Sequence, residues 1–155
     1  MTRDRRVGAE SGFVAGLEAL AFGVLIFVLG TLVVVNAWAV VDAKFAASAA
    51  AREAVRAAVE APDLDQQGPL ARAAAGQALA GHGIADDADL EPLRVGLTRC
   101  QEVAYRVRVE VPALILPGLS ERIAPFVVVA EHREVVDPYR SGLAVVQGEV
   151  PDCGF

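Results

Sequence analysis

An uninterrupted apolar stretch limits what this chain can fold into more than any other feature. From Ala19 to Val41, 23 consecutive residues carry no charge and include no proline, and Trp38 lies near the end of the stretch. At about 1.5 Å per residue, the stretch spans roughly 35 Å as an α-helix, which is enough for a bilayer core of about 30 Å. An aromatic residue near its end is typical of a membrane interface. We therefore predict a membrane span over residues 19–41.

Two other interpretations of this stretch are weaker. A buried core helix is disfavoured because a chain of 155 residues is too small to cover every face of it. A secretory signal has an apolar core of about 7–15 residues, followed by a small-residue cleavage site. Here the helical composition continues to Pro62. We expect a short basic leader over residues 1–12 and one helix over residues 13–61, whose amphipathic part, residues 42–61, packs on the domain that follows. The apolar face of that part holds Ala51, Val55, Ala58 and Val59.

Turn residues divide the rest of the chain. A polar turn is expected over residues 62–69, and its last residue is a proline, which is favourable at the first position of a helix. The Ala-rich segment 70–80 then forms a short helix, and an acidic loop follows over residues 86–92. Residues 62–92 are thus predicted to link the long helix to a β-rich domain over residues 93–155.

Alternating apolar and polar residues mark the strands of that domain. The pattern predicts strands over residues 93–98, 103–111 and 126–136, and a fourth over residues 143–147. The first two would form a hairpin that turns near Cys100 and Gln101. A long helix packed on a small antiparallel sheet is the two-layer arrangement that these elements allow, so the expected fold class is α+β.

The two cysteines and the basic residues bear on topology. Cys100 and Cys153 are an even pair outside any CxxC motif. In a small exported domain such a pair is readily a disulfide, which would stabilise the domain by about 4 kcal/mol in the chain-entropy model; two separate reduced thiols are the alternative.

Three basic residues precede the span and three follow it, so their count alone does not orient the span in the membrane. The N-terminal cluster is denser and its flank is short, so we expect an inner-membrane protein with the N-terminus in the cytoplasm and the C-terminal domain outside.

Composition and motifs exclude several functional classes. The net charge of −6 argues against binding to a nucleic-acid backbone, which requires clustered Lys and Arg. No GxSxG, P-loop, HExxH or GxGxxG pattern occurs. His132 and Glu134 would share a strand face, but no third metal ligand is close in sequence. Residues 87–91 have the carboxylate spacing of a calcium loop, but Pro92 replaces the glycine that such a loop needs. We therefore expect no catalytic, cofactor or metal site, and no enzymatic activity.

Several local features occur together in one known family. Glu18 stands just inside the apolar helix, and some 35 residues later residues 50–58 read AAREAVRAA, while residues 134–141 read EVVDPYRS. With the basic leader, these features resemble the TadE-like family, the minor pilins or pseudopilins of Tad-type pilus assembly systems. The resemblance covers most of the chain.

The resemblance implies two roles near the N-terminus. A prepilin peptidase would cleave between Gly12 and Phe13. Glu18 would then be the sixth residue of the mature chain, whereas the family has a glutamate at the fifth, so an uncleaved chain remains an alternative. The resemblance also implies that Glu18 faces the N-terminal amine of a neighbouring subunit and sets its register. Alternatively, Glu18 lies at the headgroup boundary and is solvated.

The expected function is therefore that of a pilin-like structural or assembly subunit, with lipid, other pilin-like subunits and the pilus-assembly platform as partners and a surface pilus as its destination. Small residues let membrane helices approach closely, and Gly16, Gly23 and Gly30 recur every seven residues. A membrane-anchored extracytoplasmic binding module, whose helix is only an anchor, is the alternative.

Overall fold

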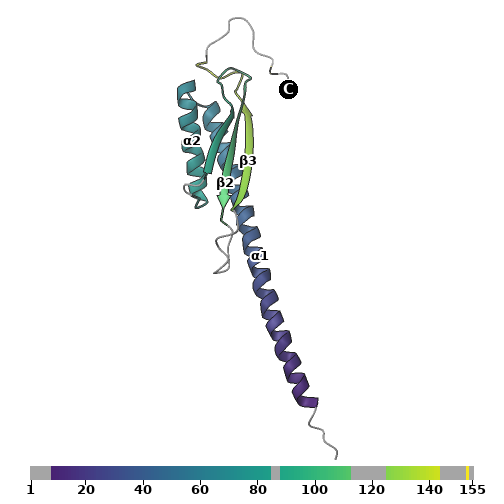
Figure 1. Cartoon of the computed structure of the whole chain (residues 1–155). Helices are drawn as coiled ribbons and strands as arrows, with labels where there is room; N and C mark the ends of the chain where they lie inside the picture. The colour runs from purple at the N-terminus through teal and green to yellow at the C-terminus, as the bar shows by residue number, and fades with distance from the viewer. Residues whose placement is uncertain (1–7, 85–87, 113–124, 144–152, 154–155) are drawn as a thin grey trace, which may run out of the picture. The chain divides into compact units, whose positions relative to one another are not determined.

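The structure, a computed structural model, describes residues 8–84, 88–112, 125–143 and 153, with side chains from residue 18 onwards. Five elements follow one another along the chain (Figure 1): α1 (Gly8–Val59), α2 (Leu64–Gly81), β1 (Ala88–Arg94), β2 (Glu102–Val111) and β3 (Phe126–Val135). The chain divides into two compact units, residues 1–38 and 39–155. The long apolar N-terminal helix and the small antiparallel sheet confirm the prediction of an α+β chain.

The helix α1 is unbroken over 52 residues, from Gly8 to Val59. It begins before the predicted residue 13 and ends just before the predicted residue 61. Two polar side chains in its apolar part donate to the carbonyl four residues earlier: Thr31 Oγ1 to Phe27 at 2.8 Å, and Asn36 Nδ2 to Leu32 at 2.8 Å. These bonds within the helix lower the cost of placing a polar side chain among apolar ones.

The sheet has the strand order β1-β2-β3, and both neighbouring pairs are antiparallel. Strand β2 therefore lies in the centre, where Val107 pairs with Leu90 on one side and Ala130 on the other. Its alternation is as predicted, because every second residue from Val103 to Val111 is buried. Strands β1 and β2 pair antiparallel as predicted, but β1 covers Ala88–Arg94 where the prediction had residues 93–98, and the register shifts between Pro92 and Arg94.

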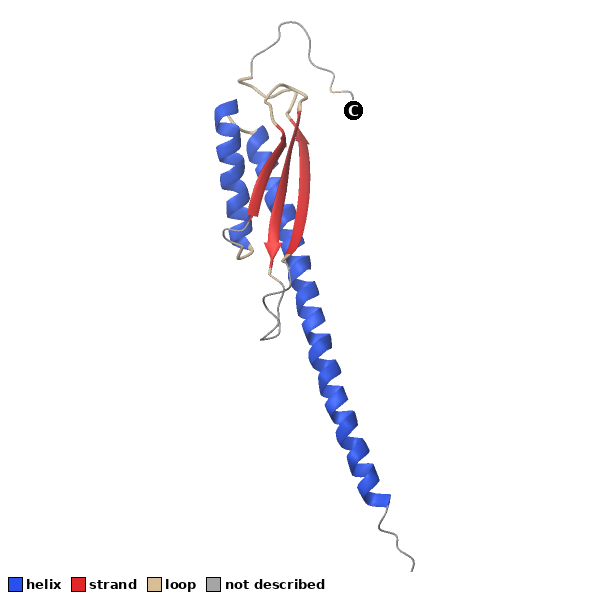
Figure 2. Cartoon of the chain, viewed as in Figure 1, coloured by secondary structure: helices blue, strands red, loops and turns tan. Residues whose placement is uncertain are grey.

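The core of the C-terminal unit lies between the helices and the inward face of the sheet (Figure 2). The C-terminal part of α1 contributes a face made almost entirely of alanine; its buried residues are Ala43, Ala46, Ala47, Ala50, Ala51, Ala54, Val55 and Ala58. Alanine keeps a helix close to its neighbours, and it is also the best helix former. The second helix presents Gln67, Ala71, Ala75 and Leu79, which are spaced four apart and so share one face.

The linker differs from the prediction in two places. Helix α2 starts at Leu64 rather than at residue 70, because Asp63 caps it by accepting from the Gln66 amide at 2.8 Å; Pro69 consequently lies inside the helix. Strand β1 starts at Ala88 rather than at residue 93, so most of the predicted acidic loop is strand. The predicted fourth strand, residues 143–147, lies outside the described residues except for Leu143.

The acidic residues of β1 explain why that strand was missed. Asp89 and Glu91 face outwards opposite Arg108 and Arg106 of β2. Arg106 donates to Glu91 at 3.2 Å and to Glu131 of β3 at 2.7 Å, so one guanidinium ties all three strands together on the outer face. Its bond to Glu131 raises the pKa of Arg106. Ion pairs to the neighbouring strand therefore help to stabilise the edge strand β1, which lacks the alternating apolar pattern of β2.

Candidate functional site

The apolar part of α1 has no buried residue over residues 19–41 and forms the first candidate site. Its large side chains project outwards, as in Phe27, which is 74% exposed. Within the part of the chain that the structure describes, α1 is the one helix long and apolar enough to cross a membrane, and none of its most apolar 18-residue window is buried. The segment is thus not the core helix of its own domain.

The residues predicted to act in assembly all lie on α1. Gly12, Phe13 and Gly16 fall where the helix is described but its side chains are not. Glu18 is exposed. A Cβ added at Gly23 or at Gly30 would meet nothing within 4 Å. A spacing of seven residues keeps these glycines on nearly the same helix face. Within the described residues, the helix face beside Gly23 and Gly30 is therefore open.

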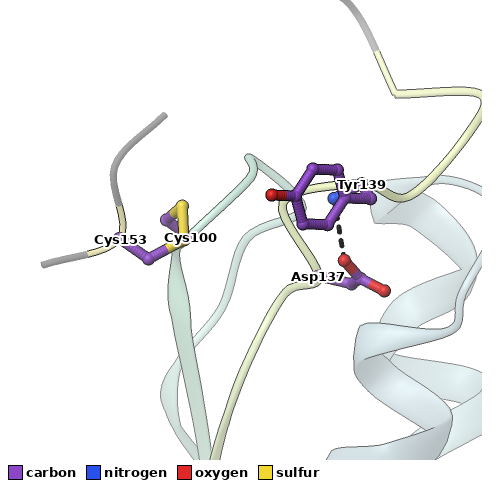
Figure 3. Close-up of a disulfide and its surroundings, with 4 residues drawn as sticks. All are labelled: Cys100, Asp137, Tyr139 and Cys153. Atoms are coloured by element: carbon purple, nitrogen blue, oxygen red, sulfur yellow. Dashed lines mark hydrogen bonds between the residues drawn. A yellow bond between two sulfur atoms is a disulfide. The ribbon is translucent and has the colours of Figure 1, made fainter. Parts of the chain in front are cut away.

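The predicted disulfide is present. Cys100 and Cys153 are bonded, with their Cα atoms 5.2 Å apart, within the usual range for such bridges. Figure 3 shows the pair with Asp137 and Tyr139 nearby; the Tyr139 amide donates to the Asp137 carboxylate at 2.7 Å. A structural disulfide indicates an oxidising, extracytoplasmic compartment. The bridge belongs to the unit that α1 would hold outside the membrane.

Arg140 caps the C-terminal end of α1. Its guanidinium donates to three successive carbonyl oxygens, those of Val59, Glu60 and Ala61, with 3.0 Å to the Glu60 oxygen. The last carbonyls of a helix have no partner within the helix, and a cation there also complements the helix dipole. Arg140 thus fastens the segment after β3 to the end of α1.

A buried glutamine joins three parts of the C-terminal unit. Gln67 of α2 is 2% exposed; its Nε2 donates to the Ala58 oxygen at 3.1 Å and to the Gly96 oxygen at 2.9 Å. The Gly96 amide in turn donates a hydrogen bond to Gln67 Oε1 at 3.2 Å. Gly96 has a φ of +154°, and a Cβ there would lie 2.0 Å from the Gln101 side chain, so only glycine fits. The network holds the β1–β2 turn against both helices.

A pocket of about 520 Å³ opens between α2 and β1. Its walls are mainly apolar, and its polar residues include Arg72 and Tyr105. Tyr105 is 2% exposed; burial raises the pKa of its phenol, and the positive charge of Arg72 lowers that pKa by a smaller amount. Among the residues that the structure describes, neither side chain has a hydrogen bond or an ion pair. The Asp65 carboxylate and the Gln67 amide also line the pocket, so its walls carry one positive and one negative group beside the neutral phenol.

The histidines and carboxylates that the structure describes form no comparable site. His82 lies at the end of α2 and His132 on β3 opposite Tyr105. Across the described ranges, no group of three or more His, Cys, Asp or Glu side chains is placed to hold a metal ion.

Comparisons with models of protein families, with curated proteins and with solved structures found no match to this chain. Sequence reasoning missed the roles of Gln67, Arg140 and Tyr105. For Gln67 a signal existed, because Gln67, Ala71 and Ala75 share one face and a lone glutamine among alanines points to a buried polar contact. Nothing local marked Arg140, whose partners lie about 80 residues earlier.

Proposed function

We propose that this protein is a pilin-like structural subunit of the TadE-like kind, which serves a Tad-type pilus or a related secretion system through helix packing and not through catalysis. One observation carries the proposal. The same unbroken helix provides an exposed apolar segment, with glycines open at Gly23 and Gly30, and the alanine face of a folded unit. Such a helix holds the unit at the membrane and offers a packing surface to other subunits.

The proposed mechanism follows from packing in lipid. Helices in a bilayer gain little from burying apolar surface, because the lipid is equally apolar, so close contact at small residues drives their association. The glycine stripe, Gly16, Gly23 and Gly30, allows such contact. In the proposed topology the N-terminus is cytoplasmic and the unit with the disulfide is outside, in the oxidising compartment that this bond requires.

The test compares two double variants of the full chain in its native host. Gly23→Leu with Gly30→Leu fills the stripe, while Ala21→Leu with Val28→Leu adds bulk at the same spacing on the opposite face. Photo-crosslinking between helices and recovery of the protein in the sheared surface fraction are measured. We expect the first variant to lower both and the second to change neither, because leucine side chains on the stripe would keep the two helix backbones apart. Unchanged assembly in the glycine variant excludes the mechanism.

Processing of the leader is tested separately. We propose that a prepilin peptidase cleaves between Gly12 and Phe13. Intact-mass spectrometry of the protein purified from its host would then find a chain that starts at Phe13, and Gly12→Leu would restore the full length. A wild-type chain that retains residues 1–12 refutes processing without affecting the packing proposal.

The pocket lined by Arg72 and Tyr105 favours a second candidate, a membrane-anchored extracytoplasmic binding module. The two candidates differ in what the helix must do. Replacing residues 1–42 with an unrelated single-span anchor preserves a binding module but removes a packing helix. Function retained after the replacement overturns the pilin proposal, and function lost while the C-terminal unit stays folded overturns the binding module.

A further inference from the structure

We propose that the C-terminal unit rests on the membrane surface through the start of β3, with Phe126 and Val127 inserted among the lipid headgroups. This inference rests on the proposed membrane span of α1 and goes beyond it, because it assigns a second lipid contact to the folded unit itself. Three observations support it. They are the position of these residues along the axis of α1, the exposure of their side chains, and the change in polarity along the strand that they begin.

Two contacts fix how β3 runs along the second part of α1. Lys44 Nζ, near the start of that part, donates to the carbonyl oxygen of Val129. Arg140, shortly after β3 ends, binds the carbonyls at the end of α1, at 3.0 Å from the Glu60 oxygen. The strand and this part of the helix therefore run in the same direction, and the start of β3 lies at the end of the unit where α1 enters it.

The contact between Lys44 and Val129 gives the position of Phe126 along the axis of α1, because the rise per residue is known for a strand and for a helix. Phe126 precedes Val129 by three residues, which is about 10 Å of strand. The same distance along a helix is about seven residues, so, counted back from Lys44, Phe126 lies near the level of Ala37 to Ala39. Ala39 belongs to the last residues of the charge-free run, and the first charged residue after the run is Asp42. If the span ends there, Phe126 lies below the water-facing boundary.

The side chains at this end of β3 suit an interface. Phe126 is 48% exposed and Val127 is 56% exposed. Phe45 of α1, close to Lys44, is 64% exposed. Exposed apolar side chains at one end of a small unit are typical of a contact surface. Their closeness to the end of the apolar run selects lipid as the partner.

Polarity changes along the outer face of β3 in the direction expected for a strand that rises from a membrane. Val127 and Val129 come first and are 56% and 38% exposed. Glu131 and Arg133 follow on the same face and join the ion pairs that cross the sheet. Apolar residues therefore lie next to the proposed bilayer and charged residues lie farther from it.

The test measures the depth of single tryptophans in full-length protein in phosphatidylcholine vesicles whose lipids carry bromine near the headgroup. Trp38 is the sole tryptophan, so Trp38→Phe provides a background without indole fluorescence. Into it we place Phe126→Trp, with Tyr139→Trp as the matched control, since Tyr139 is 79% exposed and follows the other end of β3. Phe27→Trp reports on the span alone, in vesicles whose lipids carry bromine deep in the acyl chains, because position 27 lies near the middle of the span.

We expect the indole at position 126 to emit at short wavelength and to lose at least about half of its intensity to the brominated lipid, as an interfacial aromatic should. The indole at position 139 should remain unquenched. Quenching at position 27 without quenching at position 126 overturns the inference and leaves the span intact, whether position 126 is then in water or covered by a second copy of the chain. No quenching at position 27 overturns both the span and the inference.

Discussion

Removing the guanidinium of Arg140 tests how the C-terminal unit holds α1. The side chain donates to the carbonyls of Val59, Glu60 and Ala61 in partly buried surroundings. Hydrogen bonds that involve a charged group are worth about 1.5–3 kcal/mol each to stability, but three bonds from one donor group are not additive. We therefore expect Arg140→Ala to lower the free energy of opening this helix end by about 2–3 kcal/mol, and Arg140→Lys to recover less than half, because an ammonium lacks the planar fork.

Hydrogen exchange of the full chain in nanodiscs measures this loss locally. A change of 2–3 kcal/mol corresponds to exchange about 30- to 150-fold faster at the amides near the end of α1, including that of Glu60, which donates to the Arg56 oxygen. Tyr139→Ala is the matched control, because its side chain is 79% exposed on the same turn. The reasoning is refuted if Arg140→Ala accelerates exchange no more than Tyr139→Ala does.

Three further predictions concern the folded unit, each measured by chemical denaturation of the full chain in detergent. Gln67→Leu should cost about 2–4 kcal/mol, because it leaves the buried amide and carbonyl of Gly96 without partners. Replacing Cys100 and Cys153 by serine should cost about 4 kcal/mol for a bridge that spans 53 residues. Because the pKa of Tyr105 is raised by folding, wild-type stability should fall as pH rises above about 10, where the unfolded phenol ionises first, and Tyr105→Phe should flatten this fall.

Each of these predictions has a control on the same element or residue type. Gln77→Leu, at an exposed position of α2, should change stability by less than about 0.5 kcal/mol, and a similar loss in both glutamine variants would contradict the role of the network. Reducing the wild-type disulfide should reproduce the serine variant. Tyr139→Phe should leave the alkaline fall unchanged, and an equal effect of Tyr139→Phe and Tyr105→Phe would show that burial of Tyr105 is not its cause.

The elements with strong periodicity could be predicted from sequence. The run from Ala19 to Val41 is long and free of charge, and β2 alternates apart from the buried Ala104, so each has one interpretation. The start of α2 was harder to place because Asp63 and the polar residues after it are common both in turns and in the first turn of a helix. The N-cap bond from the Gln66 amide to Asp63 at 2.8 Å decides for the helix, and the Gln66 side chain adds a second bond to Asp63 at 2.9 Å.

The contacts that join distant segments could not be predicted in this way. Arg140 meets carbonyls about 80 residues earlier, and Gln67 meets Gly96 across 29 residues, so no local pattern identifies either pair. The disulfide was foreseen because only one pairing of two cysteines exists. Periodicity shows which side of an element is buried, and it does not show which polar group that side will meet.

The alanine face of α1 has a consequence for how the helix is kept in place. A shift of four residues moves Ala43, Ala46, Ala47, Ala50 and Ala54 onto positions that also hold alanine. Packing alone therefore distinguishes poorly between the native position and one displaced by a helical turn of about 5.4 Å. The correct turn is selected by groups that have no equivalent one turn away, namely Lys44, Arg140 and the bond from Gln67 to Ala58. A force along the helix axis is thus resisted mainly by these few polar contacts, while the alanine contacts between them oppose sliding of the helix only weakly.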